Sequence, residues 1–206
     1  MRQRSGISIS EKYNKVFAPF YDGGTVVVVD GATDTLVGEV GLEGCAPKGS
    51  AYSPCWAIQS AVNDSIDRLY VTEESPHFLG VLDTKTMKEV ATIPLYHPTH
   101  QGDGGALDGG VNSDSGQGVA VDPRGNVVYV ADADAQGGIS VVDGNTNRYV
   151  GTLNLGLPSL DFLGSYAPNE GMQPFQLAMN PVTGLLYAAA EQSGVLVVLE
   201  THPCGN

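Results

Sequence analysis

The sequence predicts an all-β fold in which one antiparallel sheet unit occurs four times. Short runs of Val, Ile, Leu and aromatic residues are separated by turns rich in Asn, Asp, Pro and Gly. The first group of residues favours pleated strands, and the second group favours reversal of the chain. The whole pattern recurs at a nearly constant interval, which indicates a repeat architecture.

The clearest recurrence is a strand that ends in an acidic residue and is followed by a turn. The first copy is TVVVVDGATDTLVGEV and the last is VLVVLETHP. The acidic residues, separated by 53, 60 and 57 positions, are Asp30, Asp83, Asp143 and Glu200. An Asp in a D-x-x-T turn accepts hydrogen bonds from backbone N–H groups two or three residues later. We therefore interpret these carboxylates as turn-forming groups and not as catalytic ones.

A second strand in each copy carries an aromatic residue. The four segments are KVFAPF, RLYVTE, VVYVAD and LLYAAA. Their aromatic residues, at separations of 53, 59 and 58 positions, are Phe17, Tyr70, Tyr129 and Tyr187. Another short strand and a turn precede each segment, so one unit reads strand, turn, strand, loop, strand, acidic turn, strand. We expect the aromatic side chains to form core between neighbouring sheets.

A four-stranded antiparallel sheet of this kind cannot bury both of its faces alone. Radial stacking of several copies buries each sheet against the next, which predicts a β-propeller. The expected blades cover about residues 5–42, 56–95, 117–155 and 174–200 of a single domain, residues 1–206.

The residue pattern resembles the YVTN family of β-propeller repeats. The match is literal at YVTE, residues 70–73, and near at YVAD, residues 129–132, and the V-x-D-x-x-T elements that follow match as well. The segments YAAA and FAPF depart from the family pattern. The resemblance implies a propeller of about seven blades. It implies no particular activity, because such propellers serve many roles.

The fourth copy stops after its third strand, so the repeat lacks its outer strand there. Three arrangements are open: a four-bladed ring in which an N-terminal strand supplies the missing one, a fragment of a larger propeller, or an open arc completed by another subunit. The unequal insertions favour the last two, because a small ring needs similar, tapered blades. An open arc exposes sheet faces and edges that are liabilities unless paired. We therefore expect a non-catalytic binding or assembly module that associates with itself or with another chain completing the propeller.

The composition restricts the partners and the location. The formal net charge of −13 over 206 residues repels phosphate backbones, so nucleic acid is not expected, whereas a cation suits this charge. The sequence holds no run of 18 apolar residues for a membrane span, and no apolar signal-peptide segment. Cys45 and Cys55 form either a disulfide or two free thiols, with Cys204 left over. A disulfide favours an extracytoplasmic location, secreted or periplasmic.

The insertions between copies are the expected place for binding, because they share one face of a propeller. In the second insertion, His97, His100 and Asp103 have ligand types that suit a divalent metal such as calcium. Asp132 and Asp134 alternate along a strand end, which directs both carboxylates to one side. The alternative for both groups is a solvated polar loop. The remaining residues of the predicted binding-face loops are Tyr96, Asp108, Asp114, Asp161, Tyr166 and Glu170.

The alternative function is an enzyme, namely a metal-dependent, lactonase-like or other hydrolytic or redox propeller with its site at the inter-blade loop face. Such a site needs inward-facing side chains from several blades. The candidates by position are Asn63, Asp122, Asn180 and Glu170. The first three fall in predicted turns, which weakens this alternative. No nucleophile elbow, Walker loop, Rossmann glycine pattern or C-x-x-C is present, so no catalytic residue is assigned.

Overall fold

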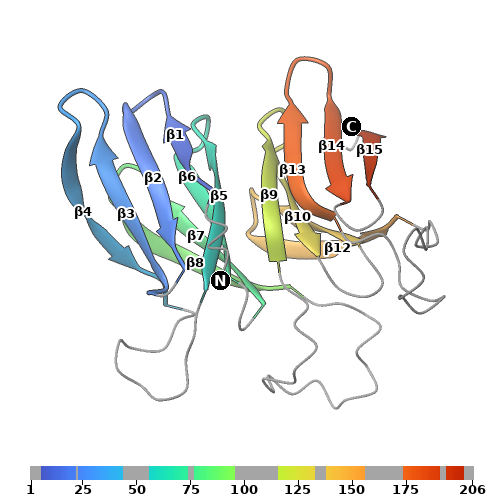
Figure 1. Cartoon of the computed structure of the whole chain (residues 1–206), viewed down its shortest axis with the longest axis horizontal. Coiled ribbons are helices and arrows are strands. Elements are labelled where there is room, and N and C mark those ends of the chain that lie inside the picture. Colours follow the sequence, from blue (N-terminus) through green and yellow to red (C-terminus); the bar gives the residue numbers. More distant parts are fainter. Residues whose placement is uncertain are drawn as a thin grey trace, which may run out of the picture.

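A computed structural model describes eight segments of the chain, residues 6–21, 23–43, 56–73, 77–95, 116–132, 138–155, 174–190 and 194–201. These residues form fifteen β-strands in four antiparallel sheets, and none of them is helical. Figure 1 shows the sheets following one another in chain order, from the left margin to the right. The predicted all-β class is confirmed.

Each sheet is one blade, and its strands pair in the order in which they occur along the chain. The first blade comprises β1 (Ser8–Ser10), β2 (Lys15–Phe20), β3 (Thr25–Asp30) and β4 (Thr35–Gly41). The second comprises β5 (Ala57–Asn63), β6 (Arg68–Glu73), β7 (Phe78–Asp83) and β8 (Lys88–Pro94). The third comprises β9 (Gly116–Asp122), β10 (Val127–Asp132), β11 (Gly138–Asp143) and β12 (Arg148–Asn154). The described part of the fourth comprises β13 (Pro174–Asn180), β14 (Leu185–Ala190) and β15 (Val195–Glu200).

One residue in the first hairpin of each blade adopts a left-handed backbone conformation. These residues, with φ between +48° and +76°, are Asn14, Asp67, Asn126 and Gly184. Asn, Asp and Gly tolerate this region best, which explains the residue types at this position. The carbonyl of each accepts a hydrogen bond of 2.7–3.1 Å from the N–H of the residue after the acidic turn residue. This bond ties the two hairpins of a blade together.

The hydrophobic core lies between the blades, in three clusters. Each cluster joins an aromatic residue of one blade to aliphatic residues of the next. The aromatic residues, none more than 6% exposed, are Phe17, Tyr70 and Tyr129. The aliphatic residues that receive them are, in the same order, Leu69 and Leu82, Val128 and Val142, and Leu186 and Ala188. The predicted core role is therefore confirmed for three of the four aromatic positions.

The four blades form an open arc. The innermost strands β1, β5, β9 and β13 each pack on the next one. The first and fourth blades lie at the two sides of Figure 1, and the other two blades lie between them. A closed four-bladed ring would bury a face of each end blade, yet both end blades keep one face exposed. The four-bladed ring is therefore not the arrangement of the described residues.

Within these same segments, no helix is present that is long and apolar enough to cross a membrane.

Candidate functional site

Most residues predicted to bind a ligand, or to form the disulfide, lie outside the described residues. They are Cys45, Cys55, Tyr96, His97, His100, Asp103, Asp108, Asp114, Asp134, Asp161, Tyr166 and Glu170. Asp132 is described: it ends β10, is half-buried, and accepts a hydrogen bond of 2.7 Å from the Ser140 hydroxyl. Among the residues that the structure describes, no group of three His, Cys, Asp or Glu side chains is placed to hold a metal. The metal site stays a prediction about the loops.

The acidic turn residues have the structural role that the sequence predicts. Asp30 Oδ1 accepts hydrogen bonds from the N–H groups of Ala32 and Thr33, at 2.8 and 3.0 Å. Asp83 and Asp143 form the same kind of turn. The N–H donors hold the pKa of the Asp30 carboxyl below its usual range, because they stabilise its charged form. These carboxylates are turn formers that stay ionised at neutral pH.

The inner-strand candidates for an enzyme site are also used structurally. Asn63 Oδ1 accepts hydrogen bonds from the N–H and the hydroxyl of Ser65, at 3.1 and 2.6 Å. Asp122 is buried and forms an ion pair with Arg124 at 2.6 Å. Asn180 Oδ1 accepts two backbone N–H groups of its own turn. All three side chains stabilise turns, and none of them is held in position for a substrate.

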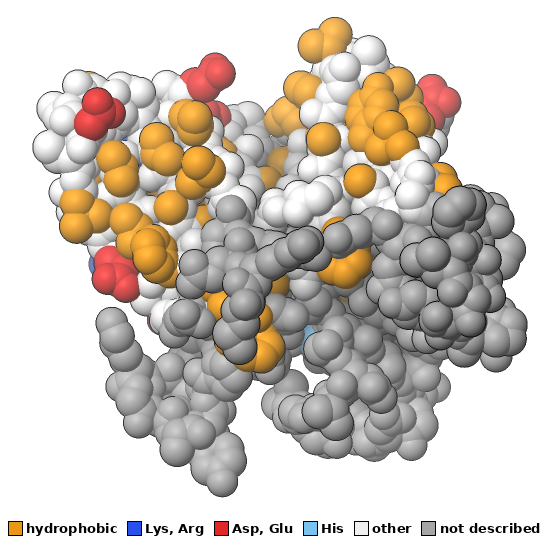
Figure 2. Space-filling view, in the orientation of Figure 1, with side chains coloured by type: hydrophobic (Ala, Val, Ile, Leu, Met, Phe, Trp, Pro, Cys, Tyr) orange, Lys and Arg blue, Asp and Glu red, His pale blue; other side chains and the backbone are white. Residues whose placement is uncertain are grey.

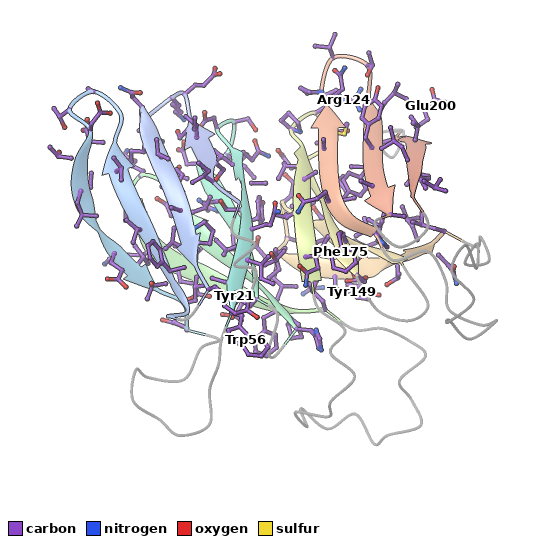
Figure 3. The ribbon with its side chains drawn as sticks, in the orientation of Figure 1. Tyr21, Trp56, Arg124, Tyr149, Phe175 and Glu200 are labelled. Atoms are coloured by element: carbon purple, nitrogen blue, oxygen red, sulfur yellow. The ribbon has the colours of Figure 1, made fainter. Side chains whose placement is uncertain are left out.

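Arg124 also joins two blades. Its guanidinium nitrogen Nη2 donates to the Thr201 hydroxyl of the fourth blade at 3.1 Å, and that hydroxyl donates to Asp122 Oδ2, also at 3.1 Å. The Arg124 hydrogen bond holds the pKa of the Asp122 carboxyl below its usual range. This polar group closes the end of the interface between the third and fourth blades, near the position of Arg124 in Figure 3.

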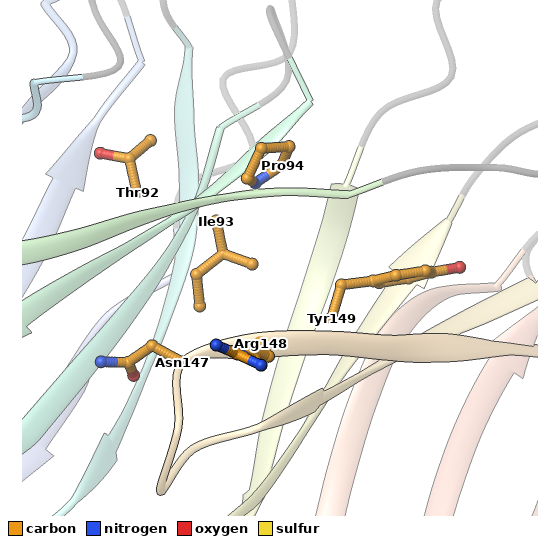
Figure 4. A pocket seen from close by; sticks show the side chains of 6 residues that line it. All are labelled: Thr92, Ile93, Pro94, Asn147, Arg148 and Tyr149. Carbon is orange, nitrogen blue, oxygen red and sulfur yellow. The ribbon is translucent and has the colours of Figure 1, made fainter.

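A pocket of about 340 Å³ lies between the outer strands of the second and third blades. It is lined by Thr92, Ile93, Pro94, Asn147, Arg148 and Tyr149. Figure 4 shows the Ile93 side chain pointing from β8 into the gap towards the strand that carries Arg148. The Tyr149 hydroxyl lies 2.6 Å from the Thr152 hydroxyl. Its lining combines apolar and polar side chains, of which Arg148 is the charged one.

Two carboxyl groups that the sequence analysis did not single out lie between the first and second blades. Glu73 ends β6 and has no exposed surface. Burial and, to a smaller extent, the neighbouring Glu89 carboxylate together raise the pKa of Glu73 to about 8. Glu89 accepts hydrogen bonds from the Glu43 N–H and from the Thr92 hydroxyl. The sequence carries no signal for this pair, because Glu73 stands where the other blades hold Phe20, Asp132 and Ala190.

One equivalent position in each blade lies four residues before the last residue of the inner strand. It falls within β5, β9 and β13, and just before β1. In blade order it is Gly6, Gln59, Gly118 and Gln176. Gln59 Nε2 donates to Gln176 Oε1 at 2.8 Å, so this bond passes over Gly118 and links the second and fourth blades. A Cβ atom at Gly118 would lie 2.8 Å from the Leu177 nitrogen, so glycine is required for the close approach of β9 and β13. Gly and Gln residues therefore alternate along the inner strands of the arc.

The first-blade face is the side of the first sheet that turns away from the second blade. Its cross-strand neighbours are aliphatic: Ile9 pairs with Val16, Val16 with Val29, and Val29 with Leu36. Ile9 is 60% exposed and Leu36 is 68% exposed. The whole face comprises Ile9, Val16, Ala18, Phe20, Thr25, Val27, Val29, Leu36 and Glu39.

The fourth-blade face is the side of the fourth sheet that turns away from the third blade. Tyr187 lies at its centre, between Ala178 on β13 and Val198 on β15. Leu196 is 61% exposed and Val198 is 50% exposed. The whole face comprises Gln176, Ala178, Asn180, Leu185, Tyr187, Ala189, Leu196, Val198 and Glu200.

The equivalent positions are buried wherever a neighbouring blade is present. The counterparts of Tyr187 are Phe17, Tyr70 and Tyr129. The counterparts of Leu196, with no exposed surface, are Val26, Leu79 and Ile139. The counterparts of Val16 on the opposite side of a blade, again with no exposed surface, are Leu69, Val128 and Leu186. The two open faces thus carry the residue positions that are buried on the two sides of each internal inter-blade interface.

Figure 2 shows both faces as groups of hydrophobic side chains, one over β2 to β4 at the left and one over β14 and β15 at the right. Glu200 lies at the margin of the second group (Figure 3). On the loop side of the first two blades, Tyr21 and Trp56 stack with ring centroids 5.3 Å apart (Figure 3). Large contiguous apolar patches on soluble proteins mark interaction surfaces. The open faces are the candidate functional site among the described residues.

Comparison with known proteins supports the fold. No family model matches the chain, and no curated protein matches its sequence. Hydrazine synthase from Kuenenia stuttgartiensis superposes with a TM-score of 0.67 at 19% identity, over 96% of this chain and 46% of that one. A putative 6-phosphogluconolactonase from Bacteroides uniformis ATCC 8492 superposes with a TM-score of 0.66 at 13% identity, over 96% of this chain and 50% of that one.

The chain therefore spans about half the length of these solved structures. At such identities the likeness shows the fold alone. Together with the blade order, it confirms the β-propeller architecture predicted from the repeats. The resemblance to the YVTN family stays a prediction.

Proposed function

We propose that this chain is a non-catalytic propeller assembly module that associates through the open faces of its end blades. The observation that supports the proposal is the contrast in burial at equivalent positions. Leu196 is 61% exposed, whereas its three counterparts have no exposed surface. Removing apolar surface from water is favourable. Residues of the kind that are buried at every internal interface therefore favour association where they are left exposed.

The charges agree with this role. The charged residues of the two faces lie towards their edges: Glu39 pairs with Val27 on the edge strand β4, and Glu200 pairs with Leu185 at the end of β15, although the chain has a net charge of −13. Depletion of charge at the centre of a patch, with charged residues such as Glu200 at its margin, is typical of protein interfaces. The acidic remainder of the surface keeps the protein soluble until the faces are covered.

The binding activity of the faces is measurable with the purified chain alone, because each copy carries both halves of an inter-blade interface. We expect the sedimentation coefficient to increase with concentration for the natural chain. Val198→Glu introduces a charge at the centre of the fourth-blade face and should abolish this increase. Val150→Glu is the matched control, since Val150 is an exposed valine on β12 outside both faces.

The two variants distinguish face-specific association from general stickiness. Loss of association in Val198→Glu with retention in Val150→Glu supports the proposal. A chain that sediments as a monomer of 21.5 kDa at every concentration contradicts it. Equal behaviour of the two variants contradicts it as well, because the fourth-blade face would then have no special role.

A further inference from the structure

The two open faces are complementary to each other and not to themselves. At each internal interface, the face that carries the aromatic residue packs on the opposite face of the next blade. The fourth-blade face is of the first kind, because it carries Tyr187. The first-blade face is of the second kind, because Val16 stands where the receiving residue Leu69 stands in the second blade. A fourth blade from one copy therefore meets a first blade from another copy as consecutive blades meet within the chain.

The side-chain sizes of the two faces match. At the interface between the first and second blades, the aromatic side is built from Phe17, Val26 and Val28, and it packs on Leu69, Val71 and Leu82. The fourth-blade face offers the larger set Tyr187, Leu196 and Val198. The first-blade face offers the smaller set Val16, Ala18 and Val29 at the receiving positions. Interiors are close-packed, so a gain of volume on one side has to be matched by a loss on the other.

The inner row of Gly and Gln residues gives an independent reason for the same pairing. Within the chain the row alternates Gly, Gln, Gly, Gln. Gln176 ends the row and is exposed, and Gly6 begins it. If a first blade from a second copy follows the fourth blade, its Gly6 comes next after Gln176. Within the chain, Gly118 comes next after Gln59 in the same way. The alternation then continues around the ring without two Gln side chains meeting at one junction.

We propose that two copies of this chain assemble head to tail into a closed, two-fold symmetric propeller of eight blades. In this ring the fourth-blade face of each copy packs on the first-blade face of the other. This inference rests on the proposed function and names the occupant of the open faces. Eight blades lie within the range observed for β-propellers, roughly four to eight.

The ring predicts how variants of the two faces combine. Ile9→Glu disables the first-blade face, and Leu196→Glu disables the fourth-blade face; both residues are exposed, so the single blades retain their internal packing. In a head-to-tail dimer each variant alone lacks both contacts and should sediment as a monomer. An equimolar mixture retains one intact contact, between the fourth-blade face of the Ile9→Glu copy and the first-blade face of the Leu196→Glu copy.

The experiment is sedimentation equilibrium of the natural chain, of each variant, and of the mixture. We expect the natural chain at twice 21.5 kDa, both single variants as monomers, and mixed dimers with an affinity reduced by about 10²- to 10⁴-fold, because two linked contacts become one. Val150→Glu should leave the natural dimer unchanged. Circular dichroism of the variants at low concentration checks that each remains a folded β protein.

Three results overturn the ring. A single variant that still dimerises shows that like faces pair with each other, or that another surface is used. Species larger than two copies show a head-to-tail contact that fails to close. A mixture that associates no better than the separate variants shows that the two faces are not partners. In each of these results the natural chain still associates, so the ring fails while the proposed assembly function stands. A natural chain that is monomeric throughout contradicts the assembly function itself.

Discussion

One position of the repeat is buried between the second and third blades, and the same position lies on the open face of the fourth blade. The residues are Tyr70 and Tyr187. Tyr70 has no exposed surface, packs on aliphatic residues of the third blade, and has its pKa raised to about 12 by burial. Tyr187 stands at the same position of its blade, half-buried on a face that no described strand covers. Both tyrosines occupy the third position of their strands, and the difference in their burial follows from the presence or absence of a described following blade.

This comparison shows what a repeat encodes. Each blade carries residues that fold its own sheet and residues that are useful only when a neighbour is present, as expected for stacked repeats. Terminal repeats of solenoid proteins have polar outer faces that cap the stack. The first and fourth blades here have the apolar faces of internal blades, which agrees with the proposed assembly.

The largest expected effect separates the two tyrosines directly. Tyr70→Ala removes a fully buried ring and should lower the free energy of unfolding by about 3–5 kcal/mol. Tyr187→Ala should lower it by less than about 1 kcal/mol in dilute monomer, where no neighbour covers the ring. Urea denaturation at low protein concentration measures both values. Tyr70→Phe is the control that keeps the ring, and similar losses for both alanine variants would break the comparison.

The second effect concerns Glu73 at the interface between the first two blades. Its pKa in the folded chain, about 8, lies above the ordinary value of 4.5, so the folded state holds more protons between these values. The stabilisation that protonated Glu73 contributes should therefore be complete below pH 4.5 and be lost as the pH rises through 8, by about 5 kcal/mol for this group.

Glu73→Gln sharpens that prediction, because a neutral amide of similar shape removes the ionisation. The variant should lose most of the decline in the free energy of unfolding between pH 5 and 9, about 4 kcal/mol, while Glu11→Gln, at an exposed turn, should keep it. Chemical denaturation across this pH range is the measurement. An unchanged pH profile in Glu73→Gln would show that the carboxyl is solvated in the folded chain.

The third effect tests how closely the inner strands approach inside an interface. A Cβ atom at Gly118 would lie 2.8 Å from the backbone of β13, whereas one at Gly151 on β12 would meet nothing within 4 Å. Gly118→Ala should therefore lower the free energy of unfolding by about 1–3 kcal/mol through overpacking. Gly151→Ala should change this free energy little. Thermal unfolding followed by circular dichroism compares the two, and equal costs would show that the third and fourth blades are not packed this closely.

The smallest effect should be independent of blade position. Asp30 in an end blade and Asp143 in an internal blade form the same turn with their own backbone. Asp30→Ala and Asp143→Ala should each cost about 1 kcal/mol, because the lost hydrogen bonds are local and partly replaced by water. Denaturant unfolding of the two variants should give similar values. A much larger cost in the internal blade would mean that the turn acids also hold blades together.

The local repeat could be predicted from the sequence, because its signals are local. The D-x-x-T turns, the aromatic strand and the strand order follow from residues within one unit, and the structure confirms them. The burial of Glu73 could not be predicted, because it depends on residues of the preceding blade that approach it from the side. The Gly–Gln row was missed for a related reason: its members are more than fifty positions apart and pair only across blades.

The candidate site was predicted less well than the fold. The sequence directed attention to polar loops with His and Asp, whose chemistry is recognisable residue by residue. The open faces consist of Val, Ile, Leu and Tyr, which look the same in a sequence whether they are buried or exposed. Only the arrangement of the blades distinguishes Leu196 from Leu79.

The central claim, that the open faces are inter-blade interfaces completed by a second copy, is tested most directly by small-angle X-ray scattering of the purified chain as it elutes from a sizing column. The account predicts a particle of twice 21.5 kDa with the compact profile of a closed ring. A particle of 21.5 kDa with the extended profile of an open arc, at every concentration from micromolar to millimolar, would contradict it.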